Sequence, residues 1–308
     1  MNAKMKIRRR WYIFLQQRFP PAEHALLIVF YFGANAMVAG SVSVSGYACT
    51  AFHLFLGLVV VGGMFFHLRI FDEIKDFRHD CTAHPDRPLA RGLLSVRQAK
   101  QGAGVLIVIE LLLSALIGVH ALSAVMCTAL YSLVMYKEFF IGQWLRPRLA
   151  TYALTHTLVA CLMSLCVFSI VTGRYFWMSP KQYALFVCAN WMIFNVFEFG
   201  RKTFAREEER DLVDSYSKRL GSIRAAGNVI GMAAVAVLIA VVLGNALSLP
   251  FLFYLAQALL LSVVVGTGLW YGISVSRTAA RAFRGACSVF ILLYNVIIVI
   301  GVGSVLWR

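Results

Sequence analysis

The chain has 308 residues, of which 60% are apolar and only 14% are charged, and its mean hydropathy is +0.75. A soluble domain carries about 25% charged residues, so this composition excludes a soluble globular protein and indicates a polytopic membrane protein. The net charge of +15 gives no support to nucleic-acid binding, because the basic residues are distributed as in a membrane topology.

Nine apolar runs are long enough to cross a bilayer as helices, which takes about 20 residues each. They lie near residues 24–44, 50–71, 102–119, 121–136, 149–173, 183–199, 223–243, 248–270 and 284–306. Residues 1–22 are basic and aromatic, and no short apolar core with a small-residue cleavage site follows them. We therefore expect a cytoplasmic interfacial segment over 1–22, within a single all-α membrane domain over 1–308.

The basic residues test this topology, because Lys and Arg collect in cytoplasmic loops. With the N-terminus inside, all 29 Lys and Arg except Arg174, Lys181 and Arg308 fall in inside segments. The positive charge is therefore an orientation signal, reinforced by attraction to anionic lipid. We expect an integral membrane protein whose N-terminus is cytoplasmic.

Four carboxylates lie within nine residues after the second predicted span, at the start of the segment 72–97. Asp72, Asp76 and Asp80 are spaced i, i+4 and i+8, so a continuing helix would align them along one stripe, with Glu73 beside it. Like charges this close need a counter-charge, and Mg²⁺ bound to a diphosphate would supply it. Neighbouring cations could hold the remaining phosphate charge; these are Arg69, Lys75, Arg78, Arg87 and Arg91.

An alternative for this segment is a solvated helix end whose acids pair with the same cations, for example Glu73 with Arg69. Pro85 and Pro88 end the helix. The residues HPDRPLARG should then form a loop that folds back over the mouth of a cavity, or else a plain connecting turn.

A second acidic segment, 198–221, follows the sixth predicted span and so returns to the same side of the membrane. This recurrence suggests a duplicated architecture around a shared central cavity. In a helix, Glu207, Asp211 and Asp214 would share a face, and Glu198 lies one turn before Arg201 and Lys202. A second metal could bind there, although an exposed charged helix with internal ion pairs is the alternative.

Two stretches of the first segment resemble the UbiA superfamily of intramembrane prenyltransferases. The family signature NDxxDxxxD is matched by DEIKDFRHD over 72–80, with Asp for Asn and Glu for Asp at the first two positions. HPDRPLARGLLS over 84–95 is similar to the family's following loop. YSLVMYKEFF over 131–140 resembles the end of its fourth helix and offers Lys137 as a phosphate contact.

The second family signature, DxxxD before a turn and a Gly, is matched less well. Aligning SYSKRLG on that turn places Glu208 at the second acid but Phe204 at the first. The departure leaves open which residues ligate a second metal.

The resemblance implies nine transmembrane helices around a central cavity that opens to the cytoplasmic side, with Mg²⁺ holding an isoprenyl diphosphate at its mouth. The expected metal ligands are Asp72, Glu73, Asp76, Asp80, Glu198, Glu207, Glu208, Asp211 and Asp214. The residues expected to act in catalysis are Asp72, Asp76, Asp80, Glu208 and Asp211. The expected diphosphate contacts are Arg69, Arg87, Arg91, Lys137, Arg201 and Lys202.

The expected reaction is ionisation of the diphosphate and transfer of the prenyl group to an aromatic or lipid acceptor. The main alternative is a UbiA-type terpene cyclase, in which an internal double bond captures the cation. A cation or solute transporter is a third, weaker hypothesis, for which Glu110 matters as the acid well inside a predicted span. Alternatively, the Glu110 carboxyl hydrogen-bonds a neighbouring helix, and His156 is a satisfied core histidine.

Overall fold

The computed structural model describes residues 6–210 and 214–306, and this part of the chain is helical without strands. Nine of its helical segments are long and apolar enough to cross a membrane. They are α2 (Pro21–Val42), α3 (Ala51–Ala83), α4 (Val96–Ile117), α5 (Val119–Tyr136), α7 (Leu149–Thr157) continued by α8 (Val159–Thr172), α9 (Lys181–Gly200), α11 (Ser222–Ala246), α12 (Phe251–Ser274) and α13 (Arg277–Leu306). The prediction of an all-α, nine-span membrane protein is confirmed.

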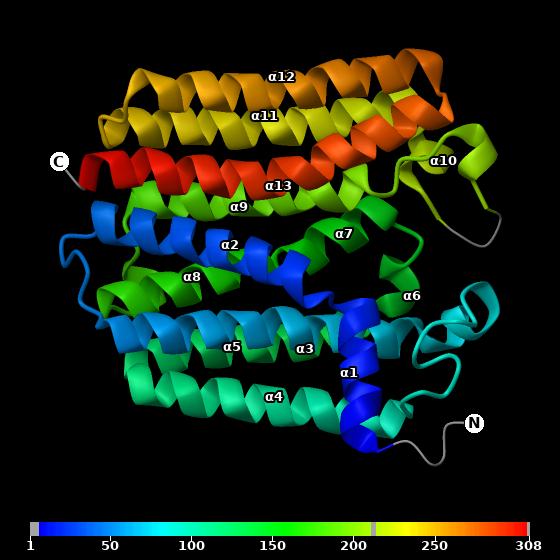
Figure 1. The fold of residues 1–308 in the computed structure, drawn as a ribbon, viewed down its shortest axis with the longest axis horizontal. Coiled ribbons are helices and arrows are strands. Elements are labelled where there is room, and N and C mark those ends of the chain that lie inside the picture. Colours follow the sequence, from blue (N-terminus) through cyan, green and yellow to red (C-terminus); the bar gives the residue numbers. More distant parts are fainter. Residues whose placement is uncertain (1–5, 211–213, 307–308) are drawn as a thin grey trace.

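Shorter helices lie between the spans or ahead of them. They are α1 (Ile7–Arg18), η1 (Glu138–Phe140), α6 (Gly142–Leu145), η2 (Phe176–Met178), η3 (Arg206–Glu208) and α10 (Tyr216–Leu220). The long helices run alongside one another, and α1 crosses the end of α3 and α4 (Figure 1). The connections from α3 to α4, from α5 to α7 and from α9 to α11 all lie at this same end (Figure 1). The two acidic segments therefore lie at one end of the bundle, as the topology predicts.

The fifth span is broken at Leu158, between α7 and α8. The hydroxyl of Thr157 donates to the carbonyl of Ala153, one turn earlier, and such back-bonding bends helices. The indole Nε1 of Trp191 on α9 donates to the carbonyl of Leu154 at 3.1 Å. Side chains thus bond two backbone carbonyls just before the break, where unsatisfied groups would be costly in lipid.

Helix α3 runs past the predicted end of its span and stops at Ala83, directly before His84 and Pro85. The following loop returns along α3: Leu89 and Leu94 are 3% and 1% exposed and pack in one cluster with Ile74. A Ser95 capping box then starts α4. The loop thus folds back onto α3 and fixes its polar end; that it covers the mouth of a cavity stays a prediction.

Candidate active site

The three aspartates lie on the last turns of α3, as predicted, but their surroundings differ. Asp80 is 3% exposed, and both its oxygens accept hydrogen bonds of 2.7 Å from Nη1 of Arg87 in the returning loop. The side chain of Asp72 is 47% exposed, with Nζ of Lys75 at 3.2 Å from its Oδ1. Asp76 is exposed and makes no hydrogen bond or ion pair with any described residue.

This arrangement leaves two exposed or half-exposed carboxylates on α3, Asp72 and Asp76, that a cation could join. Asp76 is a carboxylate without a compensating partner, one turn from Asp72 and one turn from Asp80, and carboxylate oxygens suit Mg²⁺. Within residues 6–210 and 214–306, no three His, Cys, Asp or Glu side chains converge as a complete metal cage. Mg²⁺ is commonly held by one or two carboxylates together with substrate phosphates, so Asp72 and Asp76 fit that mode.

Glu73 faces different neighbours from the aspartates. Its side chain is 2% exposed. Its Oε1 lies 2.5 Å from Nη2 of Arg18 on α1 and 3.4 Å from Nη2 of Arg69. The pairing with Arg69 is the one that the alternative interpretation predicts, and it leaves Glu73 bound to cations on the α1 side. Oε2 of Glu73 and Nε of Arg69 are buried without a hydrogen-bond partner among the described residues.

The end of α9 brings the second acidic segment to the first. Glu198 pairs with Arg201 at 2.6 Å and with Lys202 at 2.8 Å. The Glu198 carboxylate raises the pKa of the Arg201 guanidinium, and the negative charge of Asp72 on α3 acts in the same direction. Asp72 and Arg201 therefore share one electrostatic environment, across two spans that are distant in sequence.

The rest of the second segment is turned towards other partners. Glu208 accepts hydrogen bonds of 2.9 Å from both Nη atoms of Arg284 on α13, and these bonds lower the pKa of its carboxyl. Glu207 lies 3.1 Å from Arg277. These contacts anchor the connection between α9 and α11 on α13.

The expected helical face of Glu207, Asp211 and Asp214 is a wrong prediction. Residues 209–210 and 214–215 are not helical, so no single helix joins Glu207 to Asp214. Asp214 instead pairs with Arg219 at 2.8 Å. Asp211 lies outside the described residues, and its role as a ligand stays a prediction.

Two other predicted phosphate contacts have partners of their own outside the three aspartates. Arg91 donates to Oε1 of Gln17 on α1 at 2.8 Å, and Nζ of Lys137 lies over the ring of Tyr136, 5.5 Å from its centroid. Of the cations around the stripe, Lys75 is the one that contacts Asp72 directly.

Two aromatic side chains of α7 join the site and were not predicted. The hydroxyl of Tyr152 lies 3.4 Å from Nζ of Lys75, and the ring of His156 stacks on Tyr152 at 3.9 Å. Nδ1 of His156 donates to the carbonyl of Tyr152 at 2.7 Å, whereas its buried Nε2 lacks a partner among the described residues. His156 is therefore only half satisfied, contrary to the prediction. In the sequence, the i, i+4 spacing of Tyr152 and His156 at the start of the fifth span indicates that they share a helix face.

Glu110 binds a neighbouring helix, as the alternative interpretation predicts. Its side chain is 2% exposed and lies 2.8 Å from Nδ1 of His67 on α3, whose Nε2 lies 3.2 Å from Oγ of Ser132 on α5. A substituted Gly63 would place a Cβ 3.0 Å from Oε1 of Glu110, so this glycine permits the close approach of α3 and α4. The Glu110 carboxyl thus belongs to a hydrogen-bond network that links α3, α4 and α5, which weakens the transport hypothesis.

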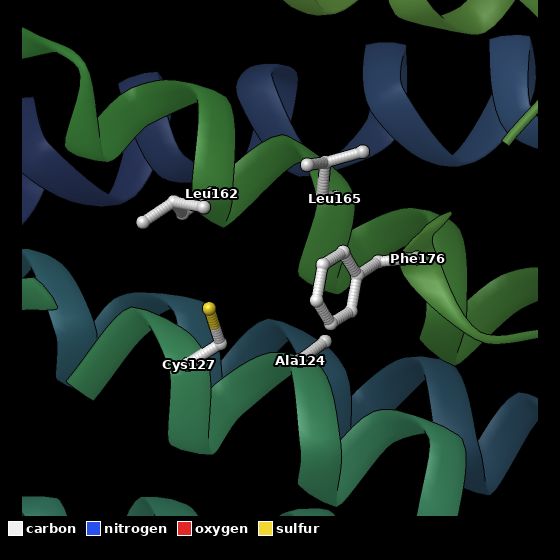
Figure 2. A pocket seen from close by; sticks show the side chains of 5 residues that line it. All are labelled: Ala124, Cys127, Leu162, Leu165 and Phe176. Carbon is white, nitrogen blue, oxygen red and sulfur yellow. The ribbon is translucent and has the colours of Figure 1, made fainter. Parts of the chain in front are cut away.

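A small crevice between α5 and α8 lies away from the acidic residues. It is lined by Ala124 and Cys127 of α5, Leu162 and Leu165 of α8, and Phe176 (Figure 2). It is too small for a water molecule and wholly apolar, so it is a packing defect rather than a site.

Comparison with known proteins places this geometry in a family. A sequence profile described as the UbiA prenyltransferase family matches residues 26–297. The chain belongs to the UbiA prenyltransferase family. A comparison with curated protein sequences found no match.

Solved structures support the UbiA fold. A structure described as digeranylgeranylglyceryl phosphate synthase in membranes is 13% identical with a TM-score of 0.67, covering 96% of this chain and 99% of that one. An apo UbiA homologue from Aeropyrum pernix K1 is 17% identical with a TM-score of 0.67, covering 89% and 97%. A UbiA homologue from Archaeoglobus fulgidus bound to GPP and Mg²⁺ is 15% identical with a TM-score of 0.53, covering 93% and 99%. At these identities the likeness concerns the fold alone.

Proposed function

We propose that the protein is a Mg²⁺-dependent membrane enzyme that ionises an isoprenyl diphosphate and transfers the prenyl group to an acceptor. The observation that carries this proposal is the Asp76 carboxylate, which has no partner among the described residues although Asp72 and Asp80 lie one turn away on each side. Bringing like charges together costs free energy unless a cation joins them. The homologue from Archaeoglobus fulgidus bound to GPP and Mg²⁺ supports the choice of ligand.

In this proposal Asp72 and Asp76 hold the metal, and Lys75 and Arg201 take up phosphate charge from two sides. Bound Mg²⁺ would neutralise the departing diphosphate, which is where positive charge lowers the barrier most. Tyr152 keeps Lys75 in place through its hydroxyl, 3.4 Å away. The metal ligands of the second segment stay a prediction. Among its acids, Glu198 pairs with Arg201, on which the charge of Asp72 also acts.

In this proposal, aromatic rings below the charged end would receive the prenyl group. Phe65 and Phe194 stack with centroids 6.0 Å apart, and Tyr31 meets Phe65 edge-on at 5.7 Å. Phe65 lies two turns before Asp72 on α3, and Phe194 lies one turn before Glu198 on α9. Ring faces stabilise cations, and apolar surroundings exclude the water that would quench an allylic cation.

The proposed orientation places the N-terminus and the acidic end of the bundle in the cytoplasm, on the basis of the Lys and Arg distribution. The acceptor would be an aromatic or lipid molecule that reaches the site from the bilayer.

The test is turnover by the purified protein in nanodiscs with Mg²⁺ and prenyl diphosphates of several lengths. Diphosphate release that requires an added aromatic or lipid acceptor, and yields a prenylated product, supports transfer. Release without acceptor, accompanied by a cyclic hydrocarbon or alcohol, would instead assign the chain to terpene cyclisation. No release under either condition, with Mg²⁺-stimulated cation flux across vesicles, would favour transport.

A further inference from the structure

A groove lies between α1 and α4 on the outside of the bundle, at the same end as the acidic segments. It has a volume of about 640 Å³ and is open to the surroundings. Trp11 and Tyr12 of α1, Phe66 of α3 and Val105 of α4 are among its lining residues. This volume lies within the range of about 300–1,000 Å³ in which small-molecule sites fall. The family profile begins at residue 26, so α1 lies outside the matched region.

The packing of α1 gives the groove a defined shape. Phe14 is fully buried and meets Phe66 at 6.2 Å, which fixes α1 across α3. A Cβ on Gly102 would lie 2.5 Å from the ring of Trp11, so the absence of a side chain there lets Trp11 rest directly on α4. The apolar wall that results is held in place by α1, even though the groove itself is open.

The groove has an apolar side and a polar side, as a lipid molecule has. On its apolar side, exposed residues continue along one face of α4 at helical spacing: Val105, Val108, Leu112 and Leu116. On its polar side, the amides of Gln98 and Gln101 form the lining. An acyl chain that lies in the groove would thus continue along these exposed apolar residues of α4.

Four basic residues lie next to the lining residues along α4 and α1. Arg97 and Lys100 lie in the first turns of α4, beside the two glutamines, and Arg8 and Arg9 lie on α1. All four are exposed, and among the described residues none of them forms an ion pair. Unpaired cations beside an apolar groove are complementary to a ligand with an anionic head and an apolar chain.

We propose that this groove binds one anionic phospholipid, with an acyl chain between α1 and α4 and its phosphate among Arg97 and Lys100 of α4 and Arg8 and Arg9 of α1. Each basic residue near an anionic membrane surface strengthens binding about fivefold. The bound lipid would hold α1 against the bundle. The inference does not depend on the proposed function, because it concerns binding outside the bundle.

The test is native mass spectrometry of the full chain in detergent, titrated with phosphatidylglycerol or with phosphatidylcholine of the same acyl chains. Val105→Trp fills the groove, and Leu112→Trp, on the same stripe but beyond the groove, is its control. Arg97→Gln with Lys100→Gln removes the charges, and Arg174→Gln with Lys181→Gln, at the other end of the bundle, is the matched control.

Wild type should bind phosphatidylglycerol at least about tenfold more tightly than phosphatidylcholine. Val105→Trp should weaken phosphatidylglycerol binding about tenfold through overpacking. The paired Gln variant should weaken it about 30-fold and reduce the preference for phosphatidylglycerol, with Arg8 and Arg9 retained. Both controls should match wild type.

Equal affinity for the two lipids, or unchanged binding by both Val105→Trp and the paired Gln variant, would overturn the proposal. Displacement of phosphatidylglycerol by a neutral quinone would assign the groove to an acceptor and would overturn it as well. Because the paired Gln variant changes only exposed side chains, it remains informative if Val105→Trp does not fold.

Discussion

Replacing Asp76 with Asn should abolish turnover and stabilise the fold. The Asp76 carboxylate makes no hydrogen bond or ion pair with a described residue, so the substitution removes only longer-range attraction to Lys75 and Arg87. It does remove repulsion from Asp72 and Asp80, each one helical turn away. Like charges at this spacing cost about 0.2–0.5 kcal/mol each, so we expect a gain of about 0.4–1 kcal/mol. The midpoint of thermal unfolding should then rise by about 1–3 °C in the absence of metal.

The same variant should lose at least about 100-fold in turnover, equivalent to about 2.7 kcal/mol of transition-state stabilisation. Diphosphate release at saturating Mg²⁺ measures the first effect, and thermal unfolding in detergent measures the second. Asp80→Asn is the matched comparison, because Asp80 is buried and bound to Arg87. That variant should lower stability by about 2 kcal/mol. A stable Asp76→Asn protein that keeps more than about a tenth of wild-type turnover would refute the reasoning.

Three further substitutions test the ion pairs. Arg18→Gln should lower the free energy of unfolding by about 3 kcal/mol, because buried Glu73 keeps only the longer contact on its own helix; chemical denaturation measures it. Arg201→Ala should raise KM for the prenyl diphosphate about tenfold or more, since a charged phosphate contact is lost; steady-state kinetics measure it. Glu208→Gln should lower the unfolding temperature near neutral pH. Because Arg284 lowers the pKa of Glu208, the pair stabilises the fold above the usual value of 4.5, and this difference should shrink as the pH falls through the lowered pKa.

Controls for these variants lie at the opposite end of the bundle. Arg174→Gln should leave the free energy of unfolding unchanged, and Lys181→Ala should leave KM unchanged. Equal effects in Arg18→Gln and Arg174→Gln would mean that the buried pair does not stabilise the fold. A pH-independent effect of Glu208→Gln would mean that its charge is not what Arg284 recognises.

Much of the fold was predictable because lipid imposes simple rules on the sequence. Hydropathy identified the nine spans, and the Lys and Arg distribution predicted the shared end that Figure 1 displays. The helical stripe of Asp72, Asp76 and Asp80 was predictable because its spacing matches the helical repeat. Local rules of this kind need no knowledge of distant contacts.

The unpredicted features all depend on contacts between distant segments. Arg18 reaches Glu73 because α1 crosses α3, and Arg284 reaches Glu208 from α13, 76 residues away in sequence. The spacing of the second acidic segment was misleading because tertiary anchoring on α13 outweighs its helical tendency. Tyr152 entered the site because α7 bends away from α8, and backbone bonding at that bend has no periodic signature.

The three aspartates show why spacing alone cannot assign function. All three repeat at one helical turn, yet the fold-back loop neutralises Asp80, Lys75 partly neutralises Asp72, and Asp76 is left without an ion pair among the described residues. A protein selected for stability alone would pair or replace that carboxylate, since repulsion from its neighbours opposes folding. Local rules are broken chiefly where function requires it. The charge of Asp76, which lies between two like charges on α3 and forms no ion pair with a described residue, is therefore a feature that cation binding explains.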